Sequence, residues 1–107
     1  MSLWMNQIVE QYGEEYIFRQ LAEESSELCQ SSLKMVRSMR GETPVRMTEA
    51  YEHVLEEVAD IEVMLHVLKK GVLNDAANAK VAAIFQKKKD RMIDRMLEGE
   101  CLDSDGK

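Results

Sequence analysis

Two short acidic clusters contain the residues of this sequence that are best suited to bind a metal ion. The first cluster is Glu23-Glu24-Ser25-Ser26-Glu27, and the second is Glu56-Glu57-Val58-Ala59-Asp60. In each cluster, two carboxylates three residues apart lie on one face of a helix, about one turn from each other. Two such faces brought together would offer four carboxylates to one hard divalent cation.

A helical projection of the first cluster, at about 100° per residue, separates inward from outward carboxylates. Glu24 falls inside the apolar sector of its helix, and Glu27 falls at the edge of that sector. Glu23 points almost directly away from it. We therefore predict Glu24 and Glu27 as metal ligands, and we keep Glu23 either as a catalytic base outside the ligand set or as a solvated residue.

The same projection applied to the second cluster selects Glu57 and Asp60. These two residues share a stripe that Met64 and Val67 continue towards the C-terminus, whereas Glu56 leans outward. A stripe that becomes apolar two turns later indicates a face that enters the protein. We therefore predict Glu57 and Asp60 as the second pair of ligands.

The residue types around these carboxylates indicate which cation would bind. Burying several carboxylates without compensation costs several kcal/mol per ion, so protonation, basic groups or a metal must neutralise them. An all-carboxylate site prefers Mg²⁺, with Mn²⁺ as a substitute, to zinc or copper. A ferritin-like di-iron site would need Glu-x-x-His pairs, but Ala50 and Val63 stand three residues before His53 and His66. The simpler alternative is that both clusters are solvated helix faces.

The elements that must position these carboxylates are predicted to be helices. The 107 residues include one proline and five glycines, and good helix formers are plentiful. Apolar periodicity and stop signals predict one short and three long helices. The first helix runs from Trp4 to Tyr12 and is followed by a break at Gly13. The second runs from Glu14 to a stop at Gly41–Pro44, and the third runs from a Thr48 cap to a stop at Gly71. The last helix begins at Asn74 or Asp75 and ends in a frayed tail over 98–107.

We expect these helices to form one all-α domain over 1–107, an antiparallel helical bundle. The third helix is apolar almost all round from Ile61 to Leu68, and such a helix needs cover on more than one side. We therefore expect a homodimer or a dimer of dimers to complete the bundle. The alternative is a monomer in which the short first helix supplies the cover.

Charge and cysteine content exclude several classes of partner. The net charge of −6 gives no electrostatic basis for binding nucleic acid or an anionic membrane surface. The longest apolar run is too short to span a bilayer. Cys29 and Cys101 lie far apart in a sequence without a secretory leader, so we expect free thiols in a reducing cytoplasm.

The spacing of the acidic residues resembles the metal-binding signature of the MazG-type, all-α nucleoside triphosphate pyrophosphohydrolases. That signature is Glu-Glu-x-x-Glu, a spacer, and Glu-x-x-Asp, which match Glu23–Glu27 and Glu57–Asp60 here. The resemblance also covers the helical layout of most of the chain. It implies Mg²⁺-dependent hydrolysis of a nucleoside triphosphate, NTP or dNTP, to the monophosphate and pyrophosphate by a dimeric or tetrameric bundle. It also implies that Glu24, Glu27, Glu57 and Asp60 are the ligands.

A basic run over 86–91 is the candidate phosphate-binding segment. The family resembled has a Lys-rich segment ending in Asn-Arg at about this place, where this sequence has Asp90-Arg91. We select Lys87 and Arg91 because their four-residue spacing puts them on one helix face. The alternative is a solvated face. For the base, Trp4 is a candidate stacking residue, although it could equally close the end of the bundle.

Two further functions are compatible with the sequence. Phosphoribosyl-ATP pyrophosphohydrolases have a similar acidic layout, but that family tends to carry a histidine four residues after its motif aspartate, where this sequence has Met64. From a different class, the chain could be a non-catalytic dimeric adaptor or regulator that keeps the fold.

Overall fold

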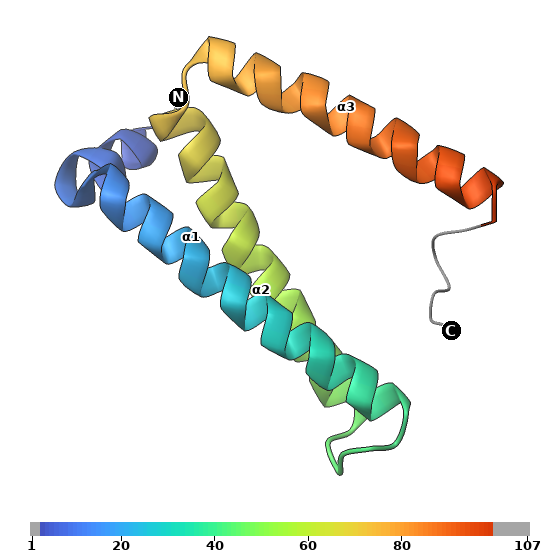
Figure 1. The fold of residues 1–107 in the computed structure, drawn as a ribbon. Helices are drawn as coiled ribbons and strands as arrows, with labels where there is room; N and C mark the ends of the chain where they lie inside the picture. Colours follow the sequence, from blue (N-terminus) through green and yellow to red (C-terminus); the bar gives the residue numbers. More distant parts are fainter. Residues whose placement is uncertain (1–2, 100–107) are drawn as a thin grey trace. The chain divides into compact units, whose positions relative to one another are not determined.

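The computed structural model describes residues 3–99, with side chains from residue 7 onward. Within this range the protein is all-α, as predicted, and contains no strand (Figure 1). Its elements are α1 (Leu3–Met39), α2 (Met47–Val67), the π-helical turn η1 (Leu68–Val72) and α3 (Asp75–Leu97). The chain forms two compact units that divide between Val72 and Leu73, so that α1, α2 and η1 belong to the first and α3 to the second.

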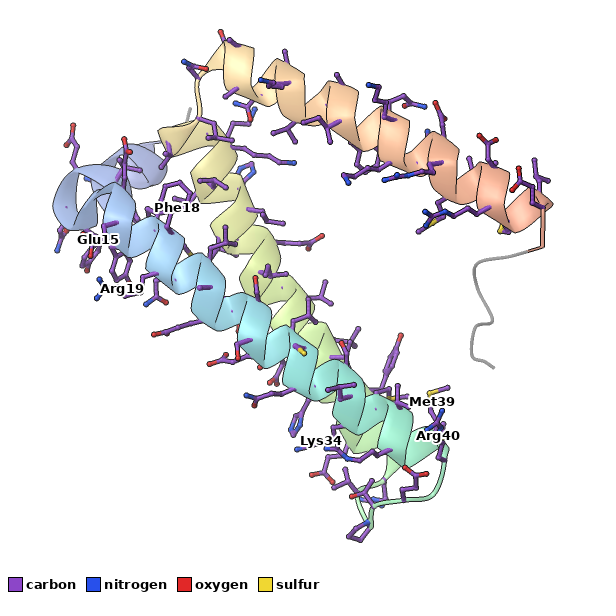
Figure 2. All side chains as sticks on the ribbon, in the orientation of Figure 1. Glu15, Phe18, Arg19, Lys34, Met39 and Arg40 are labelled. Atoms are coloured by element: carbon purple, nitrogen blue, oxygen red, sulfur yellow. The ribbon has the colours of Figure 1, made fainter. Side chains whose placement is uncertain are left out.

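The break predicted at Gly13 is present inside α1. Gly13 has φ 85° and ψ 167°, so the helix is interrupted there although both flanks are helical. The left-handed φ is a conformation that glycine adopts without steric cost. Tyr12 and Tyr16 stack across the break with ring centroids 4.6 Å apart. Beyond the break, Glu15 pairs with Arg19 on the helix surface (Figure 2).

A glycine-based cap ends α1 and reverses the chain. Gly41 has φ 71°, and its N–H donates to the Ser38 carbonyl at 3.1 Å, while the Glu42 N–H donates to the Arg37 carbonyl at 2.8 Å. These two bonds form a Schellman motif. The Ser38 hydroxyl then donates to the Val45 carbonyl at 3.0 Å, which fixes the loop to the helix end. The reversal lays α2 antiparallel against α1, and the two helices pack side by side (Figure 1).

The predicted Thr48 cap is wrong. Arg46 occupies the N-cap position of α2 with an extended backbone (φ −72°, ψ 148°) and no side-chain cap, and Thr48 lies within the first turn. The loop bond from Ser38 to Val45 brings the chain back early enough for the helix to begin at Met47. The cap predicted for the last helix is confirmed at Asn74, whose side-chain oxygen accepts from the Ala77 N–H at 2.8 Å.

The apolar core of the first unit is small. Ile17 of α1 and Val67 of α2 are its fully buried large side chains. Partly buried apolar residues pack around them: Ile8, Val9, Met64, Leu68 and Val72. Much of the remaining apolar surface of α2 is exposed, including Val63 and Leu65 at 50% and 38%. The α1–α2 pair therefore leaves apolar surface on α2 without cover among the described residues.

The helix α3 of the second unit has no buried residue. Five of its apolar residues recur at helical spacing and form one exposed stripe: Val81, Ile84, Phe85, Met92 and Met96. No helix in the described part of the chain is long and apolar enough to cross a membrane. The predicted bundle and its oligomerisation remain predictions. The predicted frayed tail lies outside the described residues from residue 100 onward.

Candidate metal centre

Four carboxylates from the two antiparallel helices meet at one point. Glu24 and Glu27 come from α1, and Glu57 and Asp60 come from α2. Each pair lies on one helix face because its members are three residues apart. One oxygen from each of the four side chains lies within 4.8 Å of the corresponding oxygen of every other. The structure thus brings together the four residues that the sequence selects.

Two oxygens of this cluster are buried without a partner. Glu24 and Glu57 are half-buried, whereas Glu27 and Asp60 are exposed. The Oε1 atom of Glu24 and the Oε1 atom of Glu57 make no hydrogen bond. Buried polar atoms in folded proteins nearly always have a partner, so two such acceptors in one cluster indicate a group that would supply positive charge.

The electrostatics of the cluster agree with this interpretation. Burial raises the pKa of Glu24, and the negative charges of Glu27, Asp60 and Glu23 raise it further. Burial likewise raises the pKa of Glu57, with added repulsion from Glu27, Asp60 and Glu24. Like charges this close disfavour the ionised forms. Either bound protons or a bound cation must therefore neutralise part of the negative charge of the four carboxylates.

The geometry fits a small divalent cation. Two oxygens bound to one Mg²⁺ at about 2.1 Å lie at most about 4.2 Å apart. The 4.8 Å limit of the cluster exceeds this by only a few tenths of an ångström. Rotation of the exposed Glu27 and Asp60 side chains would cover that difference. An all-oxygen donor set is also the chemistry that Mg²⁺ and Mn²⁺ prefer.

A groove of about 470 Å³ adjoins the carboxylate cluster. It has a mixed lining of acidic, basic and uncharged side chains from both helices: Glu27, Gln30, Ser31, Leu33, Lys34, Arg37, His53, Glu56 and Glu57. The site residues predicted from the sequence do not include Lys34, Arg37 or His53. The signal that could have found Lys34 is its position seven residues after Glu27, two turns further along the same face.

The other predicted site residues are not members of this four-carboxylate cluster. Glu23 is exposed and is not one of the four carboxylates that meet. Lys87 and Arg91 line a pocket on α3 with Ile84 and Lys88, which agrees with the shared face that their spacing predicts. Their role in binding phosphate remains a prediction.

Two predictions fall partly or wholly outside the described side chains. The Trp4 side chain lies outside them, so its stacking role stays a prediction. Cys29 is a free, exposed thiol, as expected. Cys101 lies outside the described residues.

Comparisons of the chain with known protein families, with curated proteins and with solved structures find no match. The resemblance to MazG-type enzymes therefore rests on the acidic motif and the helical layout alone. The four converging carboxylates and the groove beside them are therefore the structural features that bear on function.

Proposed function

We propose that the protein is a Mg²⁺-dependent nucleoside triphosphate pyrophosphohydrolase, converting an NTP or dNTP and water to the monophosphate and pyrophosphate. One observation supports this proposal above the others. The four carboxylates of the MazG-like motif converge within 4.8 Å, and two of their buried oxygens have no partner. A solvated helix face would not orient such oxygens towards one another away from water.

The residues of the cluster have distinct parts in this proposal. Glu24, Glu27, Glu57 and Asp60 hold Mg²⁺, with Mn²⁺ as a substitute. Mg²⁺ there would neutralise charge on the phosphate oxygens and lower the pKa of a bound water. The α-phosphate of the substrate lies over the cluster, where the exposed carboxylates leave the site open to solvent. Glu23, outside the ligand set, is the candidate base that accepts the proton of the attacking water.

Other parts of the chain supply the remaining contacts of the proposed enzyme. Lys87 and Arg91 are candidates to bind phosphate, and Trp4 is the candidate to stack on the base. No Phe, Tyr or Trp side chain among the described residues lines the groove itself.

A nucleotide panel tests the proposed reaction. Pyrophosphate release is measured from the common NTPs and dNTPs, and from phosphoribosyl-ATP, in Mg²⁺ and in EDTA. Release from at least one nucleotide in Mg²⁺ only is the expected result. Release from phosphoribosyl-ATP alone would favour the related histidine-pathway activity. No release from any nucleotide by the folded protein would favour the non-catalytic adaptor.

We also propose that the protein is a homodimer or a dimer of dimers. The exposed apolar residues of α2 and the apolar stripe of α3 need cover, because a lone helix of this length is marginal in water. Light scattering after size exclusion should therefore give a mass of at least twice the 12.3 kDa of one chain. Charging the stripe with Ile84→Lys and Phe85→Glu should reduce that mass, whereas Lys80→Glu, an exposed change on the same helix, should not. A 12.3 kDa particle for the unmodified protein would contradict the proposal.

A further inference from the structure

The groove beside the carboxylate cluster has basic side chains that the metal does not need. Lys34 and Arg37 of α1 and His53 of α2 line it, together with Glu27 and Glu57 of the cluster itself. No described carboxylate forms an ion pair with Lys34 or Arg37. In a chain of net charge −6, unpaired cations in one groove are a feature that an anionic ligand would use.

The positions of these cations along α1 suit an extended anion. Lys34 and Arg37 follow Glu27 by seven and ten residues, which is about 10 and 15 Å along the helix axis. Side chains of an α-helix lean towards its N-terminus, so both cations lean towards the carboxylate cluster. Lys34 projects from the part of α1 that runs towards the loop (Figure 2). An anion in the groove could therefore contact the cluster at one end and these cations further along.

We propose that this groove binds the β- and γ-phosphates of the substrate, with Lys34 and Arg37 donating hydrogen bonds to the phosphate oxygens. The inference rests on the proposed function, because the α-phosphate is assigned there to the carboxylate cluster. His53 contributes a ring N–H from the opposite wall. The β- and γ-phosphates are thereby assigned to the helix pair that supplies the metal ligands, and Lys87 and Arg91 of α3 are the rival pair for binding phosphate.

The acidic residues of the groove set a condition on binding. Glu56 lines the groove with Glu27 and Glu57, and these negative charges repel a free polyphosphate. The ligand is therefore the Mg²⁺ complex of the phosphate chain. Inorganic pyrophosphate, which is also the leaving product of the proposed reaction, is the smallest probe of this site.

Calorimetric titration of inorganic pyrophosphate tests the assignment. In Mg²⁺, wild-type protein should bind pyrophosphate, and Lys34→Gln with Arg37→Gln should weaken binding by about 100-fold, since each charge-assisted hydrogen bond contributes about tenfold or more. The matched control, Arg40→Gln with Arg46→Gln, removes two exposed charges outside the groove and should change binding less than about threefold. Far-UV circular dichroism checks that each variant is helical, and Mn²⁺ binding by each variant checks the carboxylate cluster.

Two further measurements separate this inference from its rivals. A nucleoside monophosphate, which lacks the β- and γ-phosphates, should bind the Lys34→Gln, Arg37→Gln variant as it binds wild type. If that variant binds pyrophosphate normally while Lys87→Gln with Arg91→Gln does not, the groove assignment is overturned. Wild-type protein that binds Mn²⁺ but no pyrophosphate would also overturn it.

The outcomes also distinguish the inference from the function on which it rests. Nucleotide hydrolysis with an unchanged KM in the Lys34→Gln, Arg37→Gln variant would refute the groove and leave the enzyme. Pyrophosphate binding that depends on Lys34 and Arg37, in a protein that hydrolyses no nucleotide, would support the groove and refute the enzyme.

Discussion

Replacing Glu57 by glutamine is expected to lower Mg²⁺-dependent pyrophosphate release by at least about 100-fold. Glutamine keeps the shape of the side chain but removes the negative charge and one anionic ligand of the four that meet within 4.8 Å. Changing residues that only support metal ligands typically costs about 10- to 100-fold, so loss of a ligand should cost at least as much. Initial rates at saturating Mg²⁺ with the best nucleotide of the panel measure the effect.

A matched variant on the same helix controls for charge and helix effects. Glu52 is an exposed glutamate of α2 that lies outside the four-carboxylate cluster and outside the groove. Glu52→Gln should keep wild-type activity, and both variants should keep the wild-type circular dichroism spectrum. Full activity of the Glu57→Gln variant would show that the ligand assignment is wrong.

Without divalent metal, the protein is expected to lose stability as pH rises above about 4.5. The pKa values of Glu24 and Glu57 are raised above 4.5 in the folded chain, first by burial and then by neighbouring carboxylates. Between 4.5 and the raised values, the folded state therefore binds more protons than the unfolded state. The contribution of these two groups to the free energy of unfolding therefore falls with pH through that window and is level above it.

Mg²⁺ should reverse this loss at neutral and alkaline pH. A cation at 100 times its Kd stabilises the folded state by about 2.7 kcal/mol, which corresponds to about 10 °C in Tm for a chain of this size. Because protons compete for the same oxygens, the shift should shrink as pH falls towards 4.5. Thermal melts from pH 4.5 to 8, in EDTA and in Mg²⁺, measure both effects.

The Glu24→Gln, Glu57→Gln variant is the control for these melts. In EDTA its stability should depend less on pH across the same window, because the two groups with raised pKa values are gone. It should also gain no Tm from Mg²⁺. A wild-type Mg²⁺ shift that is equal at pH 5 and pH 8, or that persists in this variant, would place the cation elsewhere.

Periodicity and spacing predicted the parts of the structure that depend on local geometry. Glu24 and Glu27 fall on one helix face because three residues make about one turn, and the same holds for Glu57 and Asp60. The break at Gly13 and the cap at Asn74 follow from backbone freedom and a side-chain acceptor that the sequence itself contains. The all-α class followed from composition for the same local reason.

Features that depend on how two helices meet were not predictable from one sequence. Thr48 is a good cap by type, but the bond from the Ser38 hydroxyl to the Val45 carbonyl determines where the chain turns back. The groove containing Lys34 and His53 exists only because α1 and α2 are antiparallel in a particular register. The basic run over 86–91 led to the prediction of Lys87 and Arg91, whose helix belongs to the other compact unit, and their role in binding phosphate stays a prediction.

The proposed function depends on Glu24, Glu27, Glu57 and Asp60 forming one divalent-cation site. A Mn²⁺ titration followed by electron paramagnetic resonance at pH 8 tests it most directly. We predict saturable Mn²⁺ binding by the wild-type protein, displacement by Mg²⁺, and loss of binding in the Glu24→Gln, Glu57→Gln variant. Mn²⁺ that stays free in the presence of folded wild-type protein, or that binds the variant equally well, would contradict the claim.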